Sequence, residues 1–421
     1  MTNRRTLLAG TALAATLGLA GWAAPAMAQG FSGTGTVVGG TAATIAPGNG
    51  DITLNQSEAI INWNVTGGAG ATDVTFLPLN NTVTFHEAGV SFPGTDYTVL
   101  NRVFPFDGAG NPLNATVNIG GTVNATFAGK QGGNVWFYSP HGIITSGNAS
   151  FNVGSLLLSA SDIDTSNGGS LYLSPNQIGF LPATDGNAKI QIGQNTTISA
   201  LGNNTSSIAG YVGIFAPRIE QGGSVRAGGM VGYAAGEAGT MTFNAGLVDI
   251  QITQGSADGN GIVHTGSTGG PPVAATTTRQ IKMVAMPKNT ALTMLLGGSI
   301  GFDAGTAVPD GAAVVLSSGW QPTSTPAEIA QGLGNIQIGN ATISGDPTVY
   351  ATGTLAIAPD AATTGLTRFD GLAQFNVGRS LTMDAAAGTL IDFTGNLVVS
   401  PLRQGTGENV RITAAGDPLN I

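Results

Sequence analysis

Few residues of this chain have the type and spacing to do chemistry. Asp162 and Asp164 are two positions apart, so both would face the same side of a strand. Such carboxylates could bind Ca²⁺ or act as the acid pair of a polysaccharide-cleaving enzyme. The alternative is that they cap a turn, which the following Asn167-Gly168 favours. Three further aspartates are isolated in the sequence: Asp249, Asp258 and Asp303.

The other chemical groups indicate neither a metal site nor a nucleophile. His86, His141 and His264 are far apart and lack metal-ligand spacing, and we expect the last two to be exposed turn residues. The absence of Cys excludes disulfides, thiolate metal sites and a catalytic thiol. Gly228-Gly229 precedes no predicted helix, so a phosphate cradle is not supported. We therefore expect no metal, no cofactor and no enzymatic activity.

The composition narrows the fold classes that could position such residues. The 421 residues include 66 Gly, and only 9% are charged, against about 7% Gly and 25% charged residues in ordinary domains. The chain is acidic, with 23 Asp+Glu against 14 Lys+Arg, which argues against nucleic-acid binding. Its 42% hydrophobic residues argue against disorder. A β-rich, turn-dense protein remains.

The first 28 residues are typical of an export signal. Arg4 and Arg5 provide a basic start, the segment Leu7–Trp22 is apolar and small, and a small-x-small cleavage site ends at Ala28, before Gln29. The alternative is an N-terminal membrane anchor. We expect cleavage between Ala28 and Gln29.

The remaining sequence consists of short runs of β-forming residues separated by Gly, Asn, Asp and Ser. This pattern predicts strands joined by tight turns. Clear examples of such runs are Ala115–Ile119, Asn134–Tyr138, Ser155–Ser159, Ser170–Leu173, Lys189–Ile192 and Tyr211–Phe215.

Internal repeats favour a solenoid over a sandwich or barrel. The phrase Ile190-Gln191-Ile192-Gly193, followed by Thr197-Ile198-Ser199, returns as Ile336-Gln337-Ile338-Gly339, followed by Thr342-Ile343-Ser344. The phrase Phe151-Asn152-Val153-Gly154 returns as Phe375-Asn376-Val377-Gly378. A strand that ends in a small residue and a proline recurs at Pro140, Pro175, Pro217 and Pro287.

These repeats predict an all-β parallel β-helix. Coils of roughly 20 residues would give on the order of 17 coils and a rod of about 80 Å at the usual strand spacing. Two stretches break the pattern. Gly255–Gln280 is predicted to be an excursion loop, and residues 320–334 an excursion with a short helix at Ala327–Leu333.

Several short blocks occur in a fixed order within residues 52–250. Those of the N-terminal third are Ala59-Ile60-Ile61-Asn62-Trp63, Val74-Thr75-Phe76, Leu100-Asn101-Arg102-Val103, Ser139-Pro140-His141-Gly142 and Asn152-Val153-Gly154, and further blocks follow at Gly210–Ile219, Gly222–Ala227 and Gly246–Asp249. In this order they resemble the secretion domain of filamentous haemagglutinins, the exported partners of two-partner secretion systems. Where the family has asparagines at the first and third positions of its Asn-Pro-Asn-Gly block, this chain has Ser139 and His141.

The resemblance implies a right-handed parallel β-helix, export by the Sec machinery and passage through a separately encoded outer-membrane barrel transporter. It also implies a surface-bound or released adhesin of a Gram-negative bacterium, with a host or neighbouring-cell receptor or glycan as its ligand. Residues 29–165 would be the secretion domain and 166–421 the continuing passenger. Arg102 would serve transporter recognition or pairing within the domain, the alternative being a solvated surface residue. Trp63 and Trp136 are expected to pack the cap and core, the alternative being sugar binding.

Two other functions remain open. A polysaccharide lyase or hydrolase on the same fold would need clustered carboxylates, for which Asp162 and Asp164 are the best candidates. A carrier of a contact-dependent toxin would need a compact, charged C-terminal domain, whereas residues 340–421 keep the pattern of strands and glycines.

Overall fold

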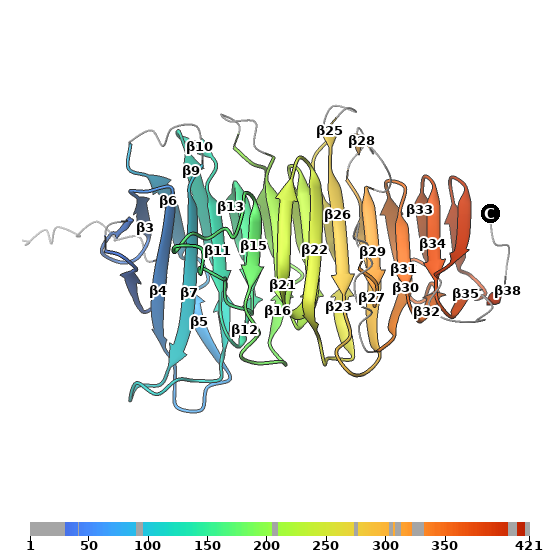
Figure 1. Cartoon of the computed structure of the whole chain (residues 1–421), viewed down its shortest axis with the longest axis horizontal. Helices are drawn as coiled ribbons and strands as arrows, with labels where there is room; N and C mark the ends of the chain where they lie inside the picture. Colours follow the sequence, from blue (N-terminus) through green and yellow to red (C-terminus); the bar gives the residue numbers. More distant parts are fainter. Residues whose placement is uncertain are drawn as a thin grey trace, which may run out of the picture.

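The computed structural model describes residues 30–40, 42–89, 96–203, 209–272, 277–302, 306–307, 313–321, 332–402 and 411–416 (Figure 1). The predicted signal segment with its cleavage site at Ala28 and Gln29, Asp303, and nearly all of the predicted helix lie outside these residues. Within the described residues no helix is long and apolar enough to span a membrane.

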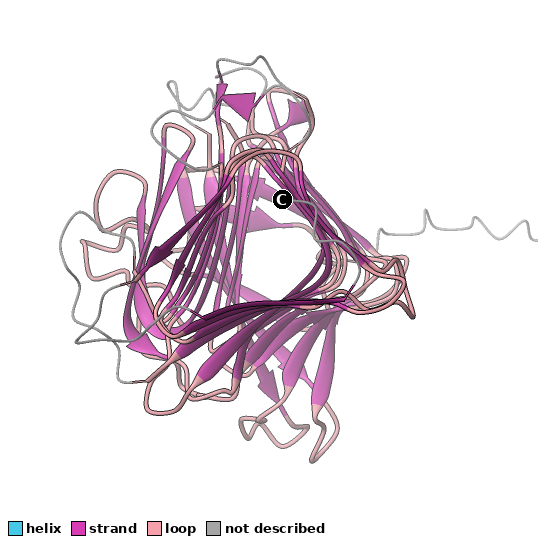
Figure 2. Ribbon diagram, turned by 90° about the vertical axis from the view of Figure 1, so that its right-hand side faces the viewer, coloured by secondary structure: helices cyan, strands magenta, loops and turns pink. Residues whose placement is uncertain are grey.

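The described chain winds into a rod of triangular cross-section with three sheet faces (Figure 2). Face A consists of β4 (Glu58–Thr66), β7 (Thr98–Phe106), β11 (Asn134–Tyr138), β14 (Ser155–Ser159), β18 (Tyr211–Ala216), the first part of β21 (Met230–Asn244), β26 (Gln280–Ala285), β29 (Val314–Ser318), β31 (Thr348–Ala351), β34 (Ala373–Val377) and β37 (Leu397–Pro401). Each strand pairs in parallel with the next strand of the list, so the predicted parallel β-helix is confirmed.

Two further faces complete each coil. Face B consists of β5 (Asp73–Leu77), β8 (Thr116–Ile119), β12 (Gly142–Thr145), β16 (Lys189–Ile192), β19 (Arg218–Gln221), β23 (Asn260–His264), the first parts of β27 (Leu292–Ile300) and β30 (Gly334–Ser344), β32 (Thr354–Ile357), β35 (Ser380–Ala385) and β38 (Arg411–Gly416). Face C consists of β3 (Asp51–Leu54), β6 (Thr82–Glu87), β9 (Thr122–Phe127), β13 (Ser150–Val153), β17 (Thr197–Ala200), β20 (Ser224–Ala227), β24 (Ser267–Gly269), the second parts of β27 and β30, β33 (Leu366–Asp370) and β36 (Leu390–Phe393).

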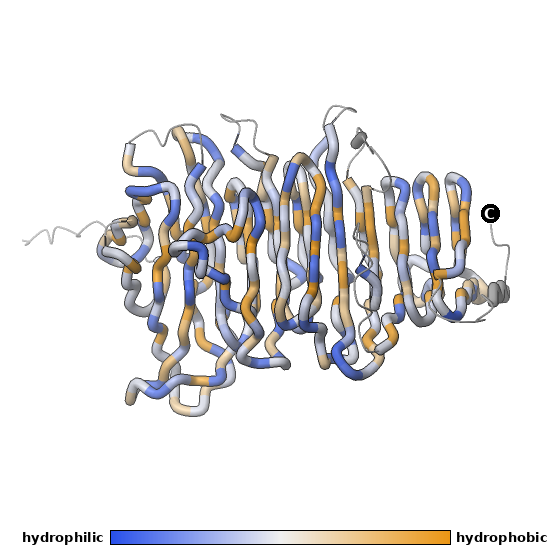
Figure 3. Tube along the Cα trace, in the orientation of Figure 1, coloured by the Kyte–Doolittle hydropathy of each residue, from blue (hydrophilic) through white to orange (hydrophobic). Residues whose placement is uncertain are grey.

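Hydrophobic and hydrophilic residues alternate along many strands of the rod (Figure 3). Because side chains point alternately inward and outward along a strand, the apolar ones stack in columns inside the rod. Parallel pairing builds one column on face B from Val74, Val117, Ile143, Ile190, Ile219, Ile262, Met294, Ile336, Leu355 and Leu381. All ten side chains are at most 4% exposed. These columns form the main core.

The longest sequence repeat reflects this stacking. Ile190 and Ile336 occupy the same column of face B, four coils apart. Ile198 and Ile343 likewise share one column of face C. The two halves of the repeated phrase therefore mark the same corner of the rod in both coils.

The other repeated phrases do not all mark equivalent positions in the coil. Phe151 lies on face C and Phe375 on face A, so their shared phrase does not mark one position in the coil. The predicted strand Ser170–Leu173 is irregular, so Pro175 does not follow a strand of the rod as the repeat had suggested. Strand preference read from single phrases cannot tell which face a strand joins.

The predicted coil length of about 20 residues was wrong. Adjacent residues of the column on face B are as close as Ile336 and Leu355 and as far apart as Ile143 and Ile190. The nine steps of this column, at about 4.8 Å each, give roughly 45 Å, well short of the predicted 80 Å. Excursions from the rod, which the sequence spacing did not reveal, account for the longer coils.

The main excursion lies elsewhere than predicted. Strands β23 and β24 lie within Gly255–Gln280 and belong to regular coils, so the prediction of one excursion loop over this segment was wrong. These strands are only five and three residues long, and the glycines around them hid their period. Instead, β15 (Gln177–Phe180), the second part of β21 and β22 (Leu247–Gly255) form an antiparallel sheet outside the rod.

This excursion sheet covers the outer side of face A and encloses a second core. Its members come from face A and from the excursion: Leu100, Trp136, Tyr138, Leu157, Ile163, Leu171, Ile178, Phe180, Tyr211, Phe215, Met230, Ala234, Met241, Phe243, Val248, Ile250, Ile252, Val284 and Met286. The rings of Phe180 and Phe215 stack at 4.0 Å across the interface. The middle of face A is thus buried on both sides.

The N-terminal end of the rod is closed by a cap. Strand β1 (Thr34–Val37) pairs antiparallel with β4, and β2 (Ala43–Ile45) pairs antiparallel with β3. Phe31 enters the interior, where its ring stacks on Phe76 at 4.1 Å and meets Trp63 at 5.2 Å. The remaining short strands are β10 (Lys130–Gln131), β25 (Thr277–Thr278) and β28 (Thr306–Ala307).

Candidate functional site

Three of the five sequence blocks of the N-terminal third lie on or next to the first strands of face A, whereas Val74–Phe76 lies on β5 of face B and Asn152–Gly154 on or just after β13 of face C. β4, β7 and β11 are neighbouring parallel strands, although their paired residues Glu58, Thr98 and Asn134 lie 40 and 36 positions apart in the sequence. Their register aligns Ile61 with Asn101, and Asn62 with Arg102 and Tyr138. The blocks Ala59–Trp63 and Leu100–Val103 therefore form one continuous surface.

The inward side chains of these blocks build the core. Ala59, Ile61, Trp63 and Val103 are all buried. Trp63 Nε1 donates a hydrogen bond to Asn101 Oδ1 at 3.0 Å. Asn101 in turn donates from Nδ2 to the backbone oxygen of Trp136 at 3.2 Å, and this satisfies its buried amide.

Trp63 and Trp136 pack as predicted, but in different cores. Trp63 belongs to the core inside the rod, whereas Trp136 belongs to the second core beneath the excursion sheet. On the outward side of β4, Ile60 is only half-buried and packs against that second core.

Arg102 pairs within the N-terminal region. Its Nε donates to Asp162 Oδ1 at 2.8 Å, and its Nη2 donates to the backbone oxygen of Ile163 at 3.2 Å. Burial raises the pKa of Asp162 above its ordinary value, although Arg102 acts in the opposite direction. Arg102 thereby ties face A to the start of the excursion.

Asp162 and Asp164 make separate local contacts. Asp162 Oδ1 accepts from Arg102 and from the backbone nitrogen of Ile163. Asp164 Oδ1 accepts from the backbone nitrogen of Ser166 at 2.9 Å, so it caps a turn. In the part of the chain that the structure describes, no cluster of three or more His, Asp or Glu residues could hold a metal ion.

The block Ser139–Gly142 forms the corner between β11 and β12. The backbone nitrogen of Gly142 donates to the oxygen of Ser139 at 3.1 Å. Gly142 has a φ of 94°, and a Cβ there would lie 2.1 Å from the backbone oxygen of Lys189 in the next coil. This corner therefore requires glycine. Ser139 is fully buried, and its backbone nitrogen donates to Ser159.

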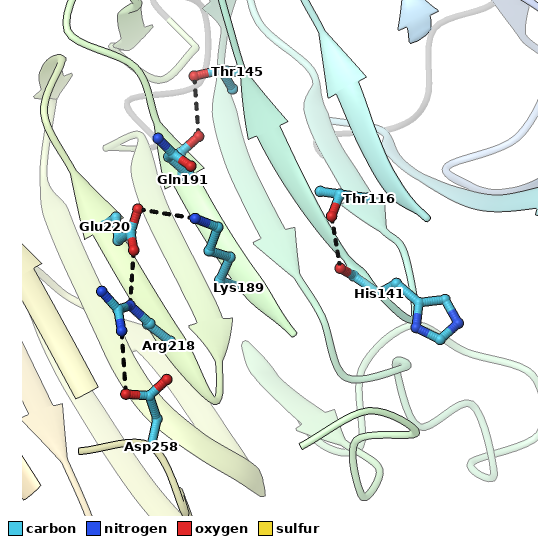
Figure 4. Close-up of polar contacts among 8 residues, drawn as sticks. All are labelled: Thr116, His141, Thr145, Lys189, Gln191, Arg218, Glu220 and Asp258. Carbon is cyan, nitrogen blue, oxygen red and sulfur yellow. Dashed lines mark hydrogen bonds and ion pairs between the residues drawn. The ribbon is translucent and has the colours of Figure 1, made fainter. Parts of the chain in front are cut away.

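His141 is a turn residue as predicted, but it is half-buried and has partners. Its Nδ1 lies 3.1 Å from Asp185 Oδ2 in the excursion. Its backbone oxygen accepts from Thr116 Oγ1 at 3.4 Å (Figure 4). Another histidine, His86 on strand β6 of face C, lies 2.7 Å from Asp51.

An open hollow of about 650 Å³ lies beside this corner. Its walls include Phe104, Tyr138, Pro140, His141 and Asp185. Burial raises the pKa of Tyr138 to about 12, which keeps the phenol neutral. We use the name N-terminal patch for five residues at this place: Asn62, Arg102, Tyr138, Pro140 and His141.

His264 contradicts the prediction of an exposed turn. It is fully buried in an inward column of face B. Its Nδ1 lies 2.7 Å from the backbone oxygen of Gly297, and its Nε2 lies 2.9 Å from Thr268 Oγ1, which also contacts the hydroxyl of Tyr233. Burial lowers the pKa of His264 to about 4. The error follows from the strands missed in this segment.

A ladder of charged side chains lies on the outside of the rod (Figure 4). The sequence did not predict it. Glu220 lies 3.3 Å from Lys189 and 2.8 Å from Arg218, and Arg218 lies 3.4 Å from Asp258. Lys189 and Arg218 occupy the same register position of β16 and β19, so the ladder joins successive coils. Such partly exposed pairs add modest stability. Only the strand register reveals them.

The fold and this geometry define a capped parallel β-helix that carries a polar patch on its first coils. No protein-family model matches the chain, and no curated protein matches its sequence.

Two solved structures are similar to the chain. The filamentous hemagglutinin secretion domain matches at 14% identity and a TM-score of 0.34, over 93% of this chain and 98% of that one. The HMW1 secretion domain from Haemophilus influenzae matches at 16% identity and a TM-score of 0.44, over 88% of this chain and 100% of that one. This likeness is limited to general shape, and the β-helix assignment rests on the strand pairing described above.

Proposed function

We propose that this chain is an exported exoprotein of the two-partner secretion type. Residues 29–165 act as its secretion and folding signal, and residues 166–421 form a shaft that serves as an adhesin. The Sec machinery delivers the chain to the periplasm of a Gram-negative bacterium. A separately encoded outer-membrane barrel transporter then passes it to the surface or the medium.

One observation carries this proposal: two of the ordered blocks that resemble secretion domains lie on the adjacent strands β4 and β7 of the first coils, and a third follows β11, the next strand of face A. Their inward residues, such as Trp63 and Asn101, hold those coils together. Their outward residues contribute to the N-terminal patch. A signal that both seeds folding and is read by a transporter needs these two sets of side chains.

The fold suggests how export and folding are coupled. The cap and first coils close one end of the interior, with Phe31 against Phe76 and Trp63. Each later coil can then add to the exposed edge of its predecessor, because coils contact mainly their neighbours. Folding outside the membrane would in this way follow the order in which the chain emerges.

A pair of deletions tests the proposal. Removing Asp51–Asp164 should abolish surface appearance and leave chain in the periplasm, as measured by immunoblot of cell fractions. The control removes one later coil, residues 355–380, after which Leu381 takes the column position of Leu355. This control should still be exported. Normal export of the first variant would refute a secretion role for the N-terminal region.

The two alternative functions receive no support from the site. The best carboxylates for a polysaccharide-cleaving enzyme are held by Arg102 and by a turn. Strands β31 to β37, between Thr348 and Pro401, continue the regular coils where a toxin carrier would begin a compact domain.

A further inference from the structure

A groove of about 680 Å³ lies on the outside of face A, between the rod and the excursion sheet. It lies where β4, β7, β11, β18 and β21 begin, far along these strands from the N-terminal patch. The rod contributes Glu58, Asp96, Thr98 and Asn134 to its wall, and the excursion contributes Tyr172 and Phe243. The volume is in the usual range of small-molecule sites.

A chain of hydrogen bonds fixes the polar wall of this groove. Asn134 Nδ2 donates to Thr98 Oγ1 at 3.1 Å, and Thr98 Oγ1 lies 3.1 Å from the hydroxyl of Tyr172. Trp136 Nε1 donates to the hydroxyl of Tyr211 at 2.9 Å. Amide and hydroxyl groups are thus held in place before any ligand arrives, which lowers the entropy cost of binding.

Aromatic rings are equally fixed in the groove. Tyr172 meets Trp136 edge to face at 5.1 Å, and Tyr211 stacks on Phe243 at 4.2 Å. Burial raises the pKa of Tyr172 and of Tyr211, so both phenols stay neutral at physiological pH. Each offers an apolar ring together with a polar hydroxyl.

The two carboxylates of the groove are fixed hydrogen-bond acceptors. Glu58 Oε1 accepts from Ser170 Oγ at 3.3 Å, and its Oε2 accepts from the backbone nitrogen of Leu171 at 2.8 Å. Asp96 Oδ1 and Oδ2 accept from the backbone nitrogens of Tyr97 and Gly133 at 2.9 and 2.8 Å. Each oxygen of Glu58 keeps room for one further donor, and Asp96, which also accepts from the side chain of Asn203, keeps room for one more.

The charge pattern of the groove selects against anions. Its described lining residues include two carboxylates and no Lys, Arg or His. A phosphate, sulfate or sialic acid would therefore be repelled. A purely apolar segment would leave the amide of Asn134 and the hydroxyl of Thr98 without water. The ligand that fits is neutral, rich in hydroxyl groups, and has apolar faces for the rings.

We propose that this groove binds a short neutral saccharide, of roughly two or three sugar units for this volume. Sugar hydroxyls donate to Glu58 and Asp96 and exchange hydrogen bonds with Asn134. The C–H face of a sugar ring packs on Tyr172. The proposal rests on the adhesin role above only for its biological setting, because binding in solution needs no transporter.

Calorimetric titration of the full mature chain tests the proposal. The probes are three neutral trisaccharides: maltotriose, cellotriose and triacetylchitotriose. Lactose and 3′-sialyllactose form a second pair that differs in one acidic sugar. We expect at least one neutral trisaccharide to bind, and lactose to bind at least tenfold more tightly than sialyllactose.

Two variants with matched controls locate the binding. Ser57→Trp, at an exposed position of the lining, should raise the Kd at least tenfold by filling the groove, while Ala387→Trp, on an exposed turn of a later coil, should not. Tyr172→Ala should weaken binding, whereas Tyr350→Ala should not. Circular dichroism confirms that each variant is folded.

Three results would overturn the proposal: no binding of any trisaccharide at millimolar concentration, equal affinities of the two tryptophan variants, or sialyllactose binding as tightly as lactose. Each would leave the secretion proposal unaffected, because that proposal is measured by export. A loss of export would likewise say nothing about binding by the purified chain.

Discussion

The side chains of the secretion-like blocks point either into the rod or away from it. Along β4 and β7, Trp63 and Asn101 point into the rod and bond to each other, whereas Arg102 points outward to the excursion. Any protein with these coils needs the inward residues. Only the outward ones can be read by a partner, so the two sets need different experiments.

A charge swap separates the two roles of Arg102. We expect Arg102→Asp to lower the secreted fraction about tenfold, because it breaks the ion pair with Asp162 and changes the N-terminal patch. The double variant Arg102→Asp with Asp162→Arg restores an ion pair but reverses the charge of the patch. We expect its export to stay low, as measured by immunoblot of the medium.

The matched control for this swap is Arg368→Asp, which breaks the 2.7 Å pair of Arg368 with Asp370 on a later coil. Its export should equal that of the unchanged chain. Full export of the double charge-swap variant would show that Arg102 serves pairing alone.

His264 makes stability depend on pH. Its pKa is about 4 in the folded chain and 6.5 when unfolded, so between these values only the unfolded state takes up the proton. The free energy of unfolding should therefore be unaffected above pH 7 and should fall by roughly 3 kcal/mol as the pH drops from 6.5 to 4. Urea unfolding at pH 7.5 and 5 measures about 2 kcal/mol of this loss.

The variant His264→Gln should lose less stability between these two pH values than the unchanged chain, because glutamine does not titrate. The control His86→Gln alters a half-exposed histidine and should not reduce the loss in this way. Identical losses in the unchanged chain and the His264 variant would contradict this account.

At the scale of elements, the sequence predicts strands better than it predicts coils. Runs of β-forming residues bounded by Gly, Asn, Asp and Ser identified β8, β11, β14, β16 and β18 nearly to their ends. The repeat around Ile190 and Ile336 revealed stacking, because inward positions at one corner of the rod accept the same residue types. Strands β23 and β24, which carry the buried residues His264 and Thr268, were not predicted because strands of five and three residues are too short to show a period.

The groove and the N-terminal patch were missed as sites for a related reason. Glu58, Asp96 and Tyr172 are isolated in sequence and meet only because β4 and β7 pair and the excursion folds back over them. Pairing of distant strands depends on register and excursion length, and neither can be read from local preference. The blocks of resemblance located the first coils but not the partners of Arg102 and His141.

The cap should stabilise the first coils and leave the stability of the later coils unchanged. Phe31→Ala removes a buried ring that packs against Phe76 and Trp63, a change that typically costs about 3–5 kcal/mol. Because coils contact mainly their neighbours, we expect amide hydrogen exchange to speed up in β4 to β6 and to stay unchanged in β33 to β35.

Phe393→Ala is the matched control for the cap. It removes a buried ring that stacks on Phe369 at 4.9 Å near the other end of the described coils. This variant should show the opposite pattern of exchange. A uniform increase along the rod in both variants would show that the molecule unfolds as one unit and that the cap has no local role.

At the scale of the whole molecule, the low charge and high glycine content have a structural cause. Apolar columns run the length of the rod, and glycines such as Gly142 turn corners where no Cβ fits. Several of the scarce charged residues form pairs that join coils or fasten the excursion, as for Glu220 and Arg102. Such a rod can grow coil by coil from a closed end, which suits delivery through a narrow pore.

Photo-crosslinking during export tests the central claim most directly. A photoreactive phenylalanine analogue is placed at Asn62 or Pro140 of the N-terminal patch, or at Arg368 as the control, in the full chain within its native bacterium. After irradiation, the account predicts a covalent adduct with an outer-membrane barrel protein from positions 62 and 140 and none from 368. The absence of adducts from both patch positions, or equal adducts from all three, would contradict it.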